Sequence, residues 1–152
     1  MRVHIGTDHA GFELKEYVKA ELAKAGYEVI DHGAETYNSD DDYPAFCIAA
    51  AEGVIADPGS LGIVIGGSGN GEQVSANKVK GIRAILAWNE DTAKLGREHN
   101  NANVVSVGAR QHSKEEALQL IKWFLETPFS EGERHIRRIK KIAAYENGGS
   151  AE

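Results

Sequence analysis

The chain has 152 residues, of which 41% are hydrophobic and 26% are charged, a composition typical of one globular domain with a proper core. No apolar run approaches the length needed to cross a bilayer and no signal sequence precedes the first strand pattern, so we expect a cytoplasmic protein without membrane contact. A net charge of −6 argues against general nucleic-acid binding, although it leaves room for a local basic site.

Strands and helices are predicted to alternate in the first third of the chain, in the order strand 2–7, helix from about 14, strand 27–30 and helix 44–56. Asp8 and His9 follow the first strand directly. Gly26 ends the first helical pattern, as glycine commonly does. An acidic loop over 38–43 leads to Pro44, which is favoured in a first helical turn.

The only cysteine, Cys47, cannot form an internal disulfide and fits a reducing compartment. It stands among Ala45, Phe46 and Ile48 in the second predicted helix. We therefore expect Cys47 to be a small core residue rather than a nucleophile.

A glycine-rich loop lies at the centre of the chain. A short apolar strand over 63–65 runs into glycines at 66, 67, 69 and 71, and a helix is predicted from about Glu72. Glycines let a ligand approach the main chain, and the start of a helix adds unpaired N–H groups, so the loop can hold an anion. The alternative is a tight turn with a solvated capping glutamate, which so dense a run of glycines makes the less favoured interpretation.

Three common glycine loops do not fit this stretch. A nucleotide P-loop needs a lysine where Glu72 stands, and a carboxylate there would repel a triphosphate. The dinucleotide-binding pattern lacks its third glycine, and the hydrolase elbow has Asn70 in place of its last glycine. What remains is an anion-holding loop with a carboxylate at its rim.

The second half of the chain continues the alternation, with strand 84–87, helix 91–98, strand 104–107, a helix capped by residue 113, and a last helix over about 130–145. No linker divides the chain, so we expect a single domain over 1–147 and a polar tail over 148–152. The order of elements predicts an α/β fold: a three-layer α/β/α sandwich around a five-stranded parallel, Rossmann-like sheet. Ligands of such sheets bind beyond the carboxyl ends of the strands, where Asp8, His9 and Arg110 should join the glycine loop.

Two further groups of polar residues leave alternatives open. His99 lies between a helix end and a strand, where histidine is common, but it could also exchange a proton near neutrality. In the last helix, Arg134 and Arg138 lie on a cationic face, which is either a solvated surface or a fork for one phosphate.

Six motifs occur together in order along the chain, namely 6–11 (GTDHAG), 42–44 (DYP), 66–72 (GGSGNGE), 76–78 (ANK), 97–103 (REHNNAN) and 134–138 (RHIRR). As a set they resemble the type B ribose-5-phosphate isomerases of the ribose/galactose isomerase family. The resemblance implies interconversion of ribose 5-phosphate and ribulose 5-phosphate, without metal or coenzyme. It also implies a homodimer with sites shared between chains, or a dimer of dimers.

The resemblance and the chemistry together suggest a role for each site residue. Moving a carbonyl between C1 and C2 requires a base, for which we propose Glu72, and an acid for ring opening, which the family pattern assigns to His99. The enediolate would be held by the loop, namely by Gly67, Ser68, Gly69, Asn70 and Gly71. The sugar hydroxyls would be oriented by Asp8, Tyr43 and Asn100. The family pattern assigns the phosphate to His9, Arg110, Arg134 and Arg138.

One position departs from many members of the family. They have a cysteine base at the start of the glycine loop, where this chain has Gly66, which implies that the base has moved across the loop to Glu72. Two other functions remain open on the sequence alone. One is isomerisation of a six-carbon substrate such as allose 6-phosphate, and the other is a non-enzymatic sugar-phosphate sensor.

Overall fold

The computed structural model describes residues 1–152. Its strands are β1 (Arg2–Thr7), β2 (Glu28–Asp31), β3 (Leu61–Gly66), β4 (Ala84–Leu86) and β5 (Val104–Gly108). Its helices are the short η1 (His9–Gly11) and α1 (Phe12–Lys24), α2 (Tyr43–Ala56), α3 (Asn70–Ala76), α4 (Glu90–Asn100), α5 (Lys114–Glu126) and α6 (Glu133–Glu146).

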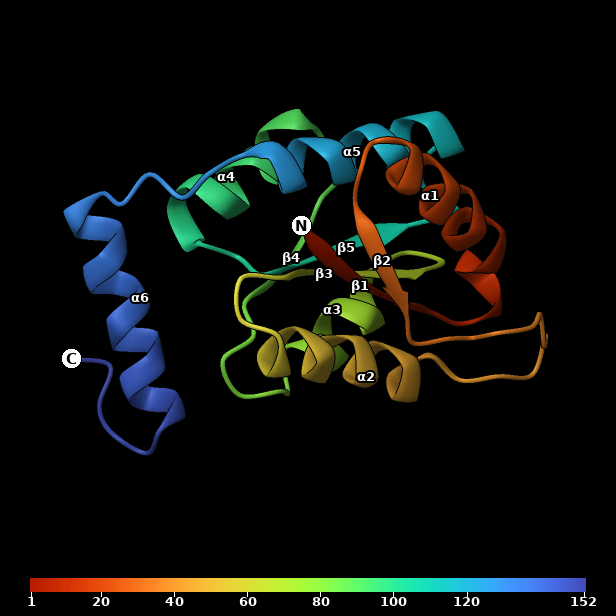
Figure 1. Cartoon of the computed structure of the whole chain (residues 1–152). Coiled ribbons are helices and arrows are strands. Elements are labelled where there is room, and N and C mark those ends of the chain that lie inside the picture. Colours follow the sequence, from red (N-terminus) through yellow and green to blue (C-terminus); the bar gives the residue numbers. More distant parts are fainter.

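The five strands form one parallel sheet in the order β2-β1-β3-β5-β4. Helices α1, α4 and α5 cover one face, and α2 and α3 cover the other (Figure 1). This arrangement confirms the predicted three-layer sandwich. The chain leaves β1 toward β2 on one side and later returns to β3 on the other, and ligands of parallel sheets bind at such a switch point.

The register of the central strands places three strand ends side by side. Thr7 at the end of β1 pairs with Ile65 of β3, and Gly66 of β3 pairs with Gly108 of β5. The loops that follow β1, β3 and β5 therefore leave the sheet next to one another. These are the loops that begin with Asp8, Gly67 and Ala109.

The core lies on both faces of β3, every residue of which is buried. A strand covered on both faces needs apolar residues without alternation, which explains the run from Leu61 to Ile65. The larger cluster includes Val18 of α1 and Phe124 of α5. The smaller cluster includes Cys47, which is 0% exposed and unpaired, so the prediction of a small core residue is confirmed. None of the helices combines the length and the apolar character that crossing a membrane requires.

Helices α3 and α6 are among those that begin elsewhere than the sequence pattern predicts. Helix α3 begins at Asn70 rather than at about Glu72, because Gly69 turns the chain with a φ of 87° and serves as the N-cap. Helix α6 begins at Glu133 rather than near Ser130, whose N–H donates instead to the Glu98 carbonyl at 3.2 Å.

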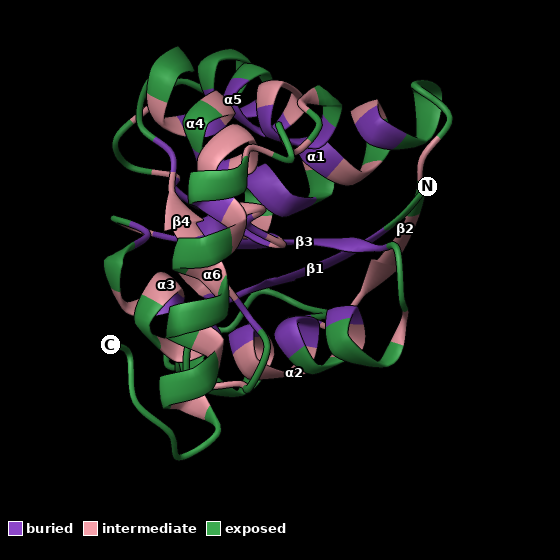
Figure 2. Ribbon diagram, turned by 90° about the vertical axis from the view of Figure 1, so that its left-hand side faces the viewer, coloured by how far each residue is buried: buried purple, intermediate pink, exposed green.

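Helix α6 stands apart from both helix layers, beside the β4 edge of the sheet (Figures 1 and 2). His135 is its only buried residue, and its apolar side chains Ile142 and Tyr145 are 56% and 71% exposed. An amphipathic helix normally covers its apolar face. In one isolated chain, the apolar face of α6 remains largely uncovered.

Candidate active site

Glu72 is buried at the end of β3, with only 4% of its surface exposed. It belongs to the first turn of α3, and its carboxylate lies against the Cα of Gly66. A Cβ at position 66 would overlap that carboxylate. The backbone of Glu72 thus lies across the loop from Gly66, while its side chain reaches back to the start of the loop.

Burial raises the pKa of Glu72, and the negative charge of nearby Asp8 adds to this effect. The backbone N–H groups of Glu72 itself and of Gly69 act in the opposite direction. A carboxylate with a raised pKa is a stronger base than a solvated one. The position of Glu72 therefore suits it to accept a proton from carbon.

Hydrogen bonds tie the glycine loop to neighbouring elements. The N–H groups of Ala109 and Arg110 donate to the carbonyls of Gly66 and Gly67 at 2.7 and 3.1 Å. The Ser106 hydroxyl donates to the Gly69 carbonyl at 2.7 Å. The loop following β3 is thus fastened to β5 and to the segment after it.

The outer part of the loop faces solvent and the aromatic ring of Tyr43. Ser68 and Asn70 are exposed, and the Asn70 N–H donates to the Ser68 hydroxyl at 3.2 Å. The Tyr43 hydroxyl packs so closely on Gly71 that a Cβ there would overlap it. Tyr43 therefore borders the loop, as predicted, although it comes from the start of α2.

Two basic side chains flank the loop. The Arg110 guanidinium lies over Gly67, with a nitrogen 3.0 Å from the place of a Cβ at that position. His9 follows β1, and its pKa is raised by a hydrogen bond with Asp41 and lowered by burial and by the charge of Arg110. The buried Asp8 accepts the Ala10 N–H at 3.0 Å and caps η1. The predicted group of Asp8, His9, Arg110 and the glycine loop does assemble at the carboxyl ends of the strands.

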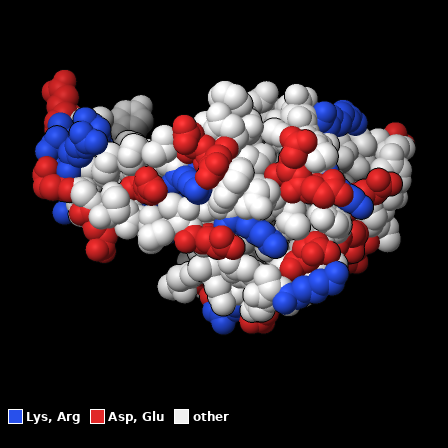
Figure 3. All heavy atoms as spheres, turned by 90° about the horizontal axis from the view of Figure 1, so that it is seen from above, with Lys and Arg blue, Asp and Glu red and all other residues white.

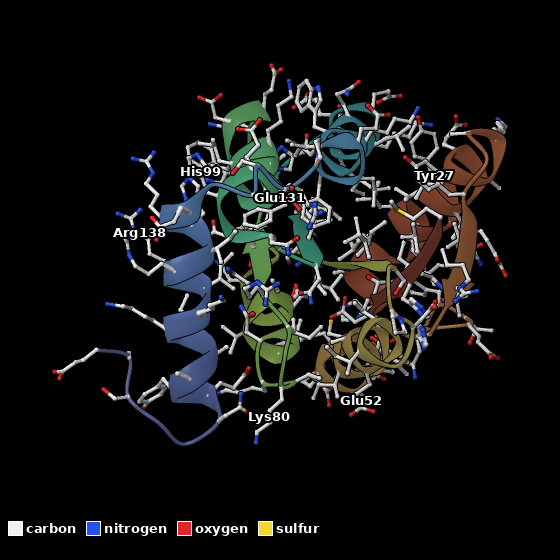
Figure 4. The ribbon with its side chains drawn as sticks, turned by 60° about the vertical axis from the view of Figure 1, so that its left-hand side comes forward. Tyr27, Glu52, Lys80, His99, Glu131 and Arg138 are labelled. Carbon is white, nitrogen blue, oxygen red and sulfur yellow. The ribbon has the colours of Figure 1, made fainter.

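The remaining predicted residues lie at the opposite end of the strands, where the strands begin. Helix α4 runs antiparallel to the strands, so its last residues, His99 and Asn100, lie where β5 begins. The His99 ring stacks on that of His135 in α6, with centroids 4.3 Å apart and planes 13° apart. Figure 4 shows His99 beside the part of α6 that carries Arg138.

Arg134 and Arg138 belong to this second group. Burial lowers the pKa of His135, and the charges of His99, Arg134 and Arg138 lower it further. Lys and Arg side chains gather at this end of the molecule, with acidic side chains around them (Figure 3). A single chain therefore does not bring His99, Asn100, Arg134 and Arg138 to Glu72.

Sequence reasoning missed two residues that take part in these groups, Asp41 and His135. Asp41 lies in a loop without periodicity, so no pattern indicated its contact with His9. His135 belongs to the 134–138 motif and follows Arg134, but the sequence assigned it no role. The ligand atoms of Asp8, His9 and Asp41 lie within 4.8 Å of one another, but hydrogen bonds to Ala10 and between His9 and Asp41 account for this grouping. We therefore describe it as a hydrogen-bonded cluster and assign no metal to it.

These features define an α/β protein whose parallel sheet presents a glycine loop and a buried carboxylate at the ends of its strands. The chain belongs to the ribose/galactose isomerase family, whose model matches residues 3–142.

Among curated relatives, the chain is 58% identical to ribose-5-phosphate isomerase B of Mycolicibacterium paratuberculosis, over 96% of this chain and 92% of that protein. Among solved structures, it is similar to ribose-5-phosphate isomerase B of Clostridium thermocellum, with a TM-score of 0.93 and 41% identity over 97% of this chain and 99% of that one. The enzyme of Mycoplasma genitalium with bound ribulose-5-phosphate gives a TM-score of 0.92 and 39% identity, and 96% of each chain is covered.

Proposed function

We propose that this chain is an aldose-ketose isomerase that interconverts ribose 5-phosphate and ribulose 5-phosphate. The observation that carries the proposal is the buried Glu72 carboxylate at the base of a glycine loop, in a chain of the ribose/galactose isomerase family. The names of the relatives and structural neighbours described above favour the five-carbon substrate over a six-carbon one. A sensor would need the phosphate-binding groups but not a buried base.

Glu72 would remove the proton from C2 of the open-chain aldose and return it to C1, while the proton of the O2 hydroxyl passes to O1, so that the carbonyl moves from C1 to C2. Between the two proton transfers at carbon, negative charge is shared by the two oxygens of the enediolate. The N–H groups of Gly67–Gly71 and the Ser68 hydroxyl are the donors closest in sequence to Glu72, and some of them would stabilise this charge. Because the loop is fastened to β5, these donors need little reorganisation during the reaction.

The other end of the substrate would lie near the cationic groups of the site. His9 and Arg110 flank the loop and would bind the phosphate through charge-assisted hydrogen bonds. Asp8 and Tyr43 would orient the sugar hydroxyls.

We further propose that the working enzyme is a homodimer in which each site takes residues from both chains. His99 would open the furanose ring, Asn100 would bind a hydroxyl, and Arg134 and Arg138 would bind the phosphate, all from the second copy. The uncovered apolar face of α6 supports a contact between copies, since burial of Ile142 and Tyr145 would stabilise it. Either a dimer or a pair of dimers meets this requirement, and we propose that the enzyme works in the cytoplasm.

Exchange of the C2 proton of ribose 5-phosphate in deuterated water tests the proposal. We expect deuterium to enter the sugar together with formation of ribulose 5-phosphate, because the base exchanges its proton with solvent. A sugar-phosphate sensor would exchange nothing. Turnover of allose 6-phosphate, measured in parallel, should be much slower than turnover of the five-carbon substrate, and faster turnover would reassign the substrate.

A further inference from the structure

Asp41 binds His9 twice through a single carboxylate oxygen. Its Oδ1 accepts the backbone N–H of His9 at 2.9 Å and lies 2.8 Å from the ring nitrogen Nδ1. The Asp41 side chain is only 10% exposed, whereas that of His9 is 27% exposed. The loop between β2 and α2 therefore holds both the main chain and the imidazole of His9. Nε2 remains as the ring nitrogen without a partner in the chain.

Some groups around His9 raise its pKa and others lower it. The Asp41 carboxylate raises the pKa of His9, and the charge of Asp8 adds to this effect. Partial burial and the Arg110 guanidinium lower it, and the Tyr37 ring packs edge-on against the imidazole without adding a charge. The balance keeps His9 cationic to a higher pH than a free histidine.

The second carboxylate oxygen of Asp41, Oδ2, is buried and has no hydrogen-bond partner. A buried carboxylate with an unpaired oxygen is costly unless a cation offsets its charge. His9 is the only titratable side chain bonded to Asp41. Asp41 therefore favours the imidazolium form of His9 over the neutral ring.

We propose that Asp41 is a positioning residue for phosphate recognition, which holds His9 so that its Nε2–H donates to the phosphate of the substrate. The inference rests on the proposed function, because it assumes that the phosphate of a sugar phosphate binds between His9 and Arg110. A phosphate that carries close to two negative charges accepts stronger hydrogen bonds from a cation than from a neutral donor. Asp41 would act through His9, without touching the substrate.

Asp41→Asn tests this role, because the amide oxygen can still accept both His9 hydrogens while the charge is lost. We expect KM for ribose 5-phosphate to rise roughly tenfold above neutral pH, with kcat little changed. The ratio of variant to wild-type KM should fall toward one as the pH is lowered and His9 becomes protonated in both proteins. Titration of the substrate phosphate cancels in this ratio. Asp40→Asn, which removes the same charge from an exposed neighbour, is the matched control and should leave KM unchanged.

A merely structural role for Asp41 would give a different pattern. It would raise KM by the same factor at every pH, or lower kcat and thermal stability together. A double-mutant cycle separates the two cases, because Asp41→Asn should add nothing to the defect of His9→Asn. Independent, additive defects would overturn the proposal.

Wild-type protein provides a measurement that does not depend on a folded variant. Inorganic phosphate should shift the His9 ring signals in NMR spectra and raise the pKa of His9, and an unaffected ring would overturn the proposal. Loss of activity on chelation with EDTA, restored by a divalent cation, would instead make the cluster an ion site and also overturn it. The phosphate titration needs no turnover, so it stays informative if the isomerase reaction itself is not observed.

Discussion

The Glu72 carboxylate occupies the space in which a side chain at position 66 would lie, because it rests against the Cα of Gly66. A cysteine at position 66, as in many family members by the resemblance described above, would therefore collide with this glutamate. Either base would act from the same end of β3. Gly66 is consequently a requirement of the Glu72 site.

Glu72→Gln should abolish isomerisation while ribose 5-phosphate still binds, since the amide keeps the shape but cannot accept a proton. We expect at least ~10²-fold loss of kcat.

The same variant should also be more stable than the wild type at pH 7. Burial raises the pKa of Glu72, so the ionised carboxylate destabilises the fold above the unfolded-state pKa of about 4.3. Glu72→Gln removes this charge and should therefore melt at a higher temperature. Glu52→Gln, on α2 (Figure 4), is an exposed control. Near-normal turnover of Glu72→Gln would exclude it as the base.

Arg138→Ala should raise KM for ribose 5-phosphate much more than it weakens binding of unphosphorylated ribose, because it removes one charged partner of the phosphate. We expect a loss of roughly tenfold or more in kcat/KM. Arg137→Ala is the matched control on the same helix, since Arg137 pairs with Glu133 at 2.9 Å. Equal effects of Arg138→Ala on both sugars would show that Arg138 belongs to a solvated surface and does not bind the phosphate.

Cys47→Ala should leave turnover largely intact. Burial and the charges of Glu72 and Asp8 raise the pKa of the Cys47 thiol far above neutrality, so it is not a nucleophile at pH 7. Loss of its packing should lower the free energy of unfolding by about 1 kcal/mol, measured by urea denaturation. Selective inactivation of a variant with an unchanged fold would contradict this expectation.

Much of the fold follows from the order of elements. So does the group that Asp8, His9 and Arg110 form beside the glycine loop. Parallel connectivity alone predicts that Asp8 and Arg110 meet at the carboxyl ends of the strands, and they do. The strand order could not be predicted, because the same alternation of strands and helices along the chain is compatible with pairing of β3 with either β4 or β5. The division into a domain over 1–147 and a tail over 148–152 stays a prediction.

Other features of the structure were less accessible to sequence reasoning. Helical periodicity predicted the two faces of α6 but not that its apolar face would be left uncovered, since that depends on which neighbours the helix meets. The contact between His9 and Asp41 joins residues 32 positions apart through an irregular loop. No periodic signal exists for such a contact.

The free energy of unfolding at acidic pH should depend on His4 and His32, a histidine pair remote from Glu72. The His4 Nδ1 lies 2.8 Å from the His32 Nε2, and the other His4 nitrogen lies 2.9 Å from Asp57. A hydrogen bond from Arg2 is the main reason that the pKa of Asp57 stays well below its usual range, so this carboxylate remains charged. Burial lowers the pKa of His32, and the charge of His4 lowers it further.

The folded state therefore favours neutral His32. This stabilisation is fully present above the ordinary histidine pKa of about 6.5 and is lost as the pH falls toward the lowered pKa. His32→Asn should make the free energy of unfolding fall less steeply below pH ~6.5, by up to about 1.4 kcal/mol per pH unit. Urea denaturation at several pH values measures this slope, and identical slopes would remove His32 as the cause.

Glu72 and His99 lie at opposite ends of the strands. Glu72 lies at the carboxyl ends and His99 where the strands begin, so one site can use both only if they come from different chains. Two inactive variants should then complement each other. When Glu72→Gln and His99→Asn chains are unfolded, mixed equally and refolded, random pairing makes about half of the dimers mixed.

Each mixed dimer would contain one site with both Glu72 and His99 and one site with neither. Activity should therefore return to about a quarter of the wild-type value, if the two sites of the dimer work independently. Each variant refolded alone serves as the control and should stay inactive. If one chain supplied both residues to its own site, no mixed dimer could contain an intact pair, and the mixture would remain as inactive as its parents.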